Sequence, residues 1–151
     1  MKVAIRKNRF LRFLLYNYRD WTDKRSYNKG QNNKIYVKGI KIATQIRIRG
    51  NNNIIIVDKD AICKNALIHI VGNNNIVIIR NQGFISGTEL WIEDNNCLLE
   101  VGKRTFIGPS HLAVTEDGSK LIIGEDCMIS SNVQIRTGDS HSLISRPLKS
   151  I

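Results

Sequence analysis

Residues 50–71 read GNNNIIIVDKDAICKNALIHIV, and residues 72–93 repeat this order as GNNNIVIIRNQGFISGTELWIE. The next two lines are DNNCLLEVGKRTFIGPSHLAVT, residues 94–115, and EDGSKLIIGEDCMISSNVQIRT, residues 116–137. A fixed period of 22 residues is typical of a solenoid, in which each repeat forms one coil and buries its apolar side against its neighbours. β-Branched runs such as Ile54–Val57 favour strands, and the Asn and Gly clusters between them favour turns.

The later lines also divide into units of six residues, each with an aliphatic first residue. The clearest units are Ile123–Met128, Ile129–Gln134 and Ile135–Ser140. Such a unit fits one flat side of a triangular coil, with the aliphatic side chain inside and a small residue at the corner, and Val57, Ile79, Val101 and Ile123 fall in one such column. Each GNNN segment forms a protruding turn, whose stacked asparagines either bond one another between coils or form a ligand-facing ridge. Extending the period backwards aligns Ile35 with Val57 and predicts an atypical first coil with a local register shift. About five coils then span residues 28–138.

The length of 151 residues suits one domain. Three cysteines, Cys63, Cys97 and Cys127, form no C-x-x-C pair, so the sequence predicts neither a zinc site nor a disulfide framework, and a reducing cytoplasm is the simpler location. The apolar piece from Phe10 to Tyr16 is short and contains Arg12. It therefore resembles neither a secretory signal nor a membrane span.

The net charge of +10 is concentrated near the N-terminus, because residues 1–49 hold 14 Lys and Arg against only Asp20 and Asp23. This segment has a net charge of +12 and the remainder −2, which suggests an anionic neighbour for the first third of the chain. No nucleic-acid-binding motif is present, so nucleic acid is not an expected partner. Residues 3–18 have one apolar and one cationic helical face; a helix there either covers the open first coil or attaches to an anionic membrane surface.

The six-residue units, together with the string Thr137-Gly-Asp-Ser-His-Ser142, resemble the hexapeptide-repeat acyltransferases. The nearest likeness is to polysaccharide and sugar O-acetyltransferases of bacterial surface-glycan pathways. The resemblance implies an all-β solenoid in the form of a left-handed parallel β-helix, acetyl-CoA as the acyl donor, a capsule or lipopolysaccharide acceptor, and a homotrimer with active sites between subunits. The expected organisation is a basic helical cap over residues 1–27, a β-helix over 28–139 and a tail over 140–151.

The same resemblance makes His141 the expected catalytic base. O-Acetylation requires a base that removes the hydroxyl proton as the oxygen attacks a thioester, and a neutral imidazole suits this task at cytoplasmic pH. Asp139 is two residues away and would orient or polarise the imidazole. The alternative for His141 is a surface histidine in a loop. No acetyl-CoA-binding residues are assigned.

Two further histidines have structural explanations. The 22-residue spacing places His69 in one column with Trp91, Ala113 and Ile135, which predicts a packed interior or corner position. It places His111 beside Glu89, one strand spacing of about 4.8 Å away, as an ordinary cross-coil pair or a functional one, in a column that continues to Val133. The three histidines occupy different columns, so no metal site is expected.

The resembling enzymes continue beyond the histidine motif with further coils that form most of the acetyl-CoA groove. Here only residues 142–151 follow His141, so we expect an N-terminal fragment, which leaves open whether the chain is an active enzyme or an inactive remnant. The expected location is the cytoplasm, including the inner face of the membrane. The alternative function is a non-catalytic solenoid that binds an anionic membrane or polymer through its basic N-terminus.

Overall fold

A computed structural model describes residues 26–139 of the chain, and every regular element in this range is a β-strand. The strands fall into three sets. Sheet A contains β1 (Tyr27–Lys29), β4 (Gln45–Arg49), β7 (Leu67–Val71), β10 (Glu89–Glu93), β13 (His111–Val114) and β16 (Gln134–Arg136). Sheet B contains β2 (Lys34–Val37), β5 (Ile54–Val57), β8 (Ile76–Ile79), β11 (Leu98–Val101) and β14 (Lys120–Ile123). Sheet C contains β3 (Ile40–Ile42), β6 (Ile62–Lys64), β9 (Phe84–Ser86), β12 (Phe106–Ile107) and β15 (Met128–Ile129).

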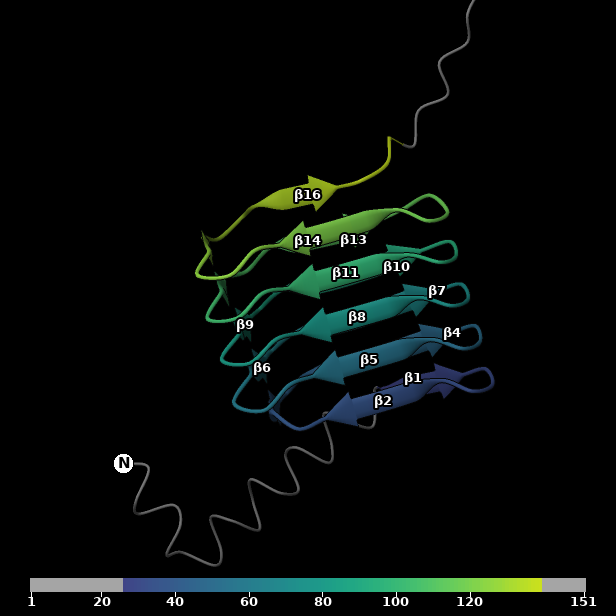
Figure 1. Ribbon diagram of the computed structural model, residues 1–151, viewed down its shortest axis with the longest axis horizontal. Coiled ribbons are helices and arrows are strands. Elements are labelled where there is room, and N and C mark those ends of the chain that lie inside the picture. Colours follow the sequence, from purple (N-terminus) through teal and green to yellow (C-terminus); the bar gives the residue numbers. More distant parts are fainter. Residues whose placement is uncertain (1–25, 140–151) are drawn as a thin grey trace, which may run out of the picture.

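The three sheets form the sides of one parallel β-helix of about five coils. Each strand pairs in parallel with the equivalent strand of the next coil, as β4, β7 and β10 do in sheet A. In Figure 1 the near strands of sheet B run to the left, the far strands of sheet A run to the right, and the chain rises from coil to coil. This winding is left-handed, as the family resemblance implied. The helical cap predicted for residues 1–27 lies almost wholly outside the described residues.

The pairing register follows the 22-residue period in the central coils, where Ile54 lies beside Ile76 and Ile76 beside Leu98. The first coil departs from the period, as expected, but the alignment of Ile35 with Val57 was wrong. Val37 pairs with Val57 while Ile40 pairs with Ile62. The first coil therefore has two residues fewer at this corner, where Gly39 packs closely against the carbonyl oxygens of the next coil.

The last coil contains the opposite irregularity. Ile107 pairs with Ile129 at the normal spacing, but His111 pairs with Gln134, and Ala113 with Arg136. One extra residue between β15 and β16 shifts the register by one position. Because side chains alternate faces along a strand, this shift exchanges an inward residue for an outward one. The predicted neighbours of Ala113 and His111, namely Ile135 and Val133, are accordingly replaced by Arg136 and Gln134.

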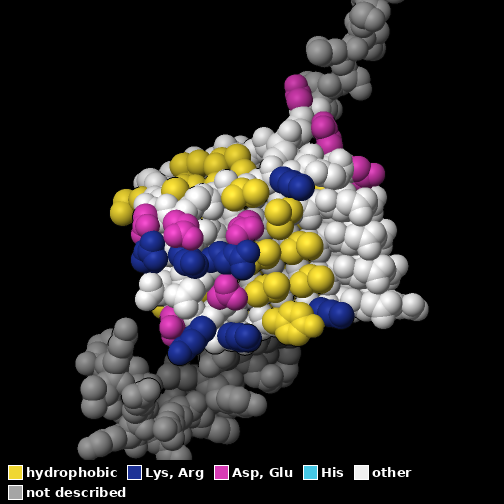
Figure 2. Space-filling view, in the orientation of Figure 1, with side chains coloured by type: hydrophobic (Ala, Val, Ile, Leu, Met, Phe, Trp, Pro, Cys, Tyr) yellow, Lys and Arg dark blue, Asp and Glu magenta, His cyan; other side chains and the backbone are white. Residues whose placement is uncertain are grey.

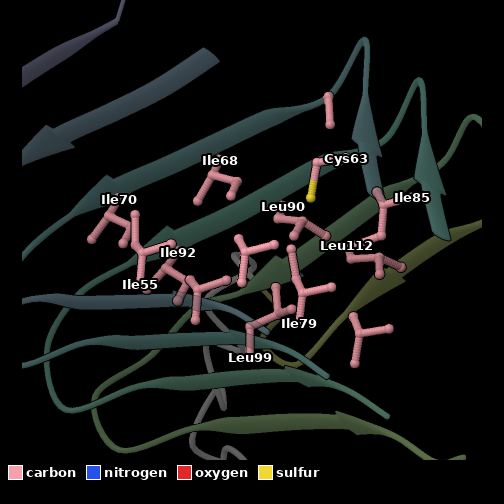
Figure 3. Packing of buried hydrophobic residues seen from close by; sticks show 14 of the residues in the cluster. Ile55, Cys63, Ile68, Ile70, Ile79, Ile85, Leu90, Ile92, Leu99 and Leu112 are labelled. Carbon is pink, nitrogen blue, oxygen red and sulfur yellow. The ribbon is translucent and has the colours of Figure 1, made fainter. Parts of the chain in front are cut away.

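The interior of the coils is filled by columns of aliphatic side chains. The predicted column of Val57, Ile79, Val101 and Ile123 is buried, with at most 9% of any side chain exposed. Figure 3 shows side chains from all three sheets converging on the axis, including Ile68 and Leu90 of sheet A. Each buried aliphatic side chain contributes roughly 1.5–3 kcal/mol. A polar substitution in any of these columns would therefore be costly.

The GNNN segments form a corner turn between sheets A and B, as predicted, and two ladders of side-chain amides run along it. In the outer ladder the Oδ1 of Asn73 accepts the backbone N–H of Asn51 at 2.9 Å, and Asn95 does the same for Asn73. In the inner ladder Asn53 and Asn75 are fully buried. The third Asn of a GNNN segment such as Asn75 therefore satisfies backbone groups inside the solenoid.

The outer face of sheet B is apolar over β5 and β8, while the neighbouring corner carries charge. The outward positions on β5 and β8 are Ile54, Ile56, Ile76 and Ile78, and Figure 2 shows apolar side chains gathered over these strands. The charged corner contains ion pairs such as Arg80–Glu100, at 2.7 Å, and Arg104–Asp126, at 2.6 Å. Within residues 26–139, no helix has the length and apolarity required to span a membrane.

Candidate functional site

The outer face of sheet A carries a row of polar and aromatic side chains because alternate strand residues point away from the core. On β7 and β10 the inward residues, Ile68 and Leu90, are buried, whereas His69 and Trp91 lie on the outer side. The prediction of an interior or corner position for His69 was wrong. The 22-residue period correctly aligned His69 with Trp91, but columns of outward residues repeat with the same period as columns of inward ones.

His69 is held against Trp91 in a stacked arrangement, with ring centroids 4.0 Å apart and planes inclined by 30°. Burial, and then the neighbouring Arg47 guanidinium, lower the pKa of His69 from its ordinary value of 6.5. Its Nδ1 atom is buried and has no hydrogen-bond partner within the described residues. This environment favours the neutral imidazole, so His69 serves as an aromatic platform for Trp91 rather than as a charged group.

The predicted contact between Glu89 and His111 is confirmed. Nδ1 of His111 lies 3.0 Å from Oε2 of Glu89, and the two residues occupy adjacent strands in register. On the same face, Nε1–H of Trp91 donates to Oε1 of Glu93 at 2.8 Å. Both carboxylates of β10 thus fix the orientation of a ring, and the Trp91 and His111 rings lie 6.0 Å apart.

A groove of about 300 Å³ opens on this face toward the last coil, and we call it the sheet A groove. Its lining residues are Trp91, Glu93, His111, Ala113, Thr115 and Arg136. Ala113 is the small member of the central column, so its short side chain leaves space between Trp91 and Arg136. The volume is near the lower end of the range of about 300–1,000 Å³ that ligand pockets occupy.

The predicted catalytic segment begins at the edge of this groove. Thr137 accepts the backbone N–H of Thr115 at 3.0 Å and donates its hydroxyl to the Thr115 carbonyl at 2.9 Å, which fixes the chain after β16. Asp139 follows at the surface. His141 lies outside the described residues.

The groove residues Trp91, Ala113 and Arg136 were not identified from sequence as a site. The period alone paired Ala113 with Ile135, so it did not place Arg136, the only guanidinium in the groove lining, beside Ala113. A detectable signal did exist: Ile129 to Ile135 is six residues, whereas the equivalent inward residues of the preceding coil, Ile107 and Leu112, are five apart.

The other candidate groups are inert or dispersed. The six-residue pattern also predicts interior positions for Cys63 and Cys127. Burial raises the pKa of the Cys63 thiol to about 12, as an interior position requires, whereas Cys127 is only half-buried and lies at a corner. Among residues 26–139, no group of three or more His, Cys, Asp or Glu side chains is arranged to hold a metal ion. The site therefore consists of the sheet A groove and the segment that follows it.

Comparison with known proteins supports the acyltransferase fold. No protein-family model and no curated protein sequence matches the chain. Chains of solved structures do match, including the following two. The polySia-specific acetyltransferase NeuO superimposes with a TM-score of 0.68 and 28% sequence identity over 78% of this chain. The polysialic acid O-acetyltransferase OatWY superimposes with a TM-score of 0.69 and 26% identity over 79% of this chain.

The chain is similar to the hexapeptide-repeat acyltransferases, as predicted. The aligned region covers 54% of NeuO and 58% of OatWY, so this acyltransferase-like chain spans little more than half the length of either structure. The likeness therefore bears on the β-helix and on the groove that its outer face forms.

Proposed function

We propose that this protein is an O-acetyltransferase that transfers the acetyl group of acetyl-CoA to a hydroxyl group of a bacterial surface saccharide. The observation that carries this proposal is the likeness to two polysialic acid acetyltransferases over nearly four fifths of the chain. The sheet A groove supports it, because the groove ends beside the segment that leads to His141.

In the proposed reaction His141 is the general base. The acceptor hydroxyl attacks the thioester carbonyl carbon as the imidazole removes its proton, the carbon–sulfur bond then breaks, and the thiol of coenzyme A leaves with the proton returned by the imidazolium. Asp139 orients the imidazole. A groove of about 300 Å³ holds roughly one sugar ring and not a whole acetyl-CoA molecule, so we assign it to the acceptor side of the reaction.

Radiolabelled acetyl-CoA and oligosialic acid provide the test, with release of the coenzyme A thiol measured in parallel. We expect His141→Gln to lower kcat by about 10²–10⁴-fold without raising the KM for acetyl-CoA, since general-base catalysis contributes an effect of that size. Lys59→Gln, in the exposed turn between β5 and β6, is the control and should retain full activity. Absence of both acetyl transfer and coenzyme A binding in the wild-type protein would reject the proposal.

We also propose that the protein acts as a homotrimer in the cytoplasm. The apolar outer face of sheet B, with Ile56 and Ile78 at its centre, is a suitable surface for packing against a second copy. Light scattering coupled to size-exclusion chromatography should give three times the chain mass, and Ile56→Glu should give a single chain mass. A wild-type protein that remains monomeric at high concentration would contradict the proposed trimer.

The uneven charge favours a second candidate, a non-catalytic solenoid bound to an anionic membrane through residues 1–25. Co-sedimentation with vesicles containing anionic lipid separates it from the enzyme. Binding that is lost on deletion of residues 1–25, without any acetyl transfer, would support this candidate. A lack of binding at low salt would exclude it.

A further inference from the structure

The central column on the outer face of sheet A is a stack of flat groups with one member missing. Pairing places His69, Trp91, Ala113 and Arg136 on successive strands, so neighbouring positions are about 4.8 Å apart. His69 already stacks on one face of Trp91. On the other side of Trp91, Ala113 has no group beyond Cβ to fill the space, and this gap is the centre of the sheet A groove.

The gap has the dimensions of one ring. Two strand spacings separate Trp91 from Arg136, about 9.6 Å, and a ring in van der Waals contact with both flanking groups requires about 7–8 Å. Ala113 is buried, with 2% of its surface exposed, and forms the floor. Indole and guanidinium planes both accept a ring against their faces. A pyranose ring placed over Ala113 would therefore contact Trp91 on one side and Arg136 on the other.

One charged group of the groove has no partner among residues 26–139. Glu93 accepts the Trp91 indole N–H and Glu89 contacts His111, so both nearby carboxylates have a hydrogen-bond partner, while Glu93 keeps its negative charge in the groove lining. Arg136 makes no hydrogen bond or ion pair with any residue in the range 26–139, whereas Arg80 and Arg104 pair with carboxylates in the charged corner. A guanidinium presents parallel N–H donors that match a carboxylate in a bidentate pair. The missing counterion of Arg136 is therefore assigned to the ligand.

We propose that the sheet A groove binds one carboxylate-bearing pyranose ring of an acidic saccharide, packed on Trp91 with its carboxylate on Arg136. This inference deepens the proposed function and rests on it only for the acceptor role of the saccharide; binding itself does not require catalysis. The position is suitable for transfer, because Thr137 is bonded to Thr115 of the groove lining and begins the segment that leads in sequence to His141.

Direct binding tests the proposal without any acetyl transfer. Trp21 and Trp91 are the two tryptophans of the chain, so Trp21→Phe in the full-length protein leaves Trp91 as the sole fluorescent reporter. Short oligosialic acid is titrated against this protein, and the same oligomer with its carboxylates reduced to alcohols is the matched ligand. We expect saturable quenching by the acidic oligomer and at least tenfold weaker binding of the reduced one.

Two variants locate the ligand. Ala113→Leu fills the gap and should abolish quenching while the thermal unfolding temperature stays at or above that of the parent. Arg136→Gln should weaken binding about tenfold, whereas Lys59→Gln, which removes the same charge from the exposed turn between β5 and β6, should leave the affinity unchanged.

The proposal would be overturned by unchanged affinity in Ala113→Leu, by equal weakening in Arg136→Gln and Lys59→Gln, or by no binding of oligosialic acid to the parent. Quenching by coenzyme A but not by the saccharide, lost in Ala113→Leu, would also overturn it, since the adenine would then occupy the gap. Saccharide binding that Ala113→Leu abolishes supports the groove even if no acetyl transfer is found, in which case the proposed enzymatic function fails alone. If Ala113→Leu retained full acetyl transfer, the proposed enzymatic function would stand, and the sheet A groove would be rejected as the acceptor site.

Discussion

Replacing Asn75 with alanine should destabilise the solenoid far more than replacing Asn73, although both belong to the same GNNN turn. The Asn75 side chain is completely buried. Its Oδ1 accepts the backbone N–H of Cys97 at 2.9 Å, and its Nδ2 donates to the carbonyl of Asp94 at 2.9 Å. Asn75→Ala leaves the buried Cys97 N–H without its acceptor and the partly buried Asp94 carbonyl without its donor.

The expected magnitude follows from these two contacts. A buried polar group left without its partner costs about 1–3 kcal/mol and a partly buried hydrogen bond about 0.5–1.5 kcal/mol, so Asn75→Ala should lower the free energy of unfolding by about 1.5–4.5 kcal/mol. Asn73 makes equivalent contacts, accepting from the Asn51 N–H and donating to Oδ1 of Asn95, but these lie near the surface, where water replaces a lost partner. Asn73→Ala should therefore cost only about 0.5–1.5 kcal/mol.

Equilibrium denaturation in urea, followed by far-ultraviolet circular dichroism, measures both changes. The comparison requires equal denaturant dependence for the two variants and the parent, so that midpoints convert directly into free energies. If Asn75→Ala cost no more than Asn73→Ala, the inner amide ladder would not be a significant source of stability, and the reasoning from burial would be refuted.

Three other outcomes follow from individual positions. Gly72→Ala should abolish folding, because φ is +130° and a Cβ atom would lie 1.8 Å from a carbonyl oxygen of the next coil. Gly118→Ala, with φ +77° and no atom within 4 Å of the new Cβ, should lower the free energy of unfolding by only about 1 kcal/mol. Equal losses of stability in urea denaturation would contradict this difference. Cys63, with a pKa of about 12, should resist alkylation at pH 8 in the folded protein and react after denaturation; rapid labelling of the native thiol would disagree. The pKa of His69 in the folded protein is below 6.5, so the unfolded chain binds this proton more readily and the free energy of unfolding falls as the pH drops through and below 6.5. His69→Gln should reduce that loss of stability. An NMR titration that gave a His69 pKa above 6.5 would contradict this prediction, because protonation would then stabilise the folded state.

The architecture of this protein was accessible from sequence because a solenoid is nearly one-dimensional. Each coil contacts only its neighbours, so a 22-residue spacing in sequence becomes one strand spacing in space. The column of Val57, Ile79, Val101 and Ile123 and the contact between Glu89 and His111 were predicted on this basis. The left-handed winding followed from the family resemblance and not from the period.

Period alone did not decide which face a column occupies, and His69 shows the reason. Inward and outward columns share the same period, and only the alternation within β7, where Ile68 and Ile70 are buried, places His69 outside. An inserted residue at a corner changes more, because it alters which residues become neighbours on adjacent coils. The extra residue before β16 brings Arg136, in place of Ile135, beside Ala113. This shift creates the charged end of the sheet A groove.

The sequence by itself therefore determined the solenoid, its repeat and its amide ladders, because these depend on local strand and turn preferences repeated at a constant spacing. Only the tertiary structure decided the site. The groove exists because three consecutive coils place a large ring, a methyl group and an unpaired guanidinium in line on one outer face. Such an arrangement depends on the register across the corners, and a single inserted residue changes every neighbour that follows it.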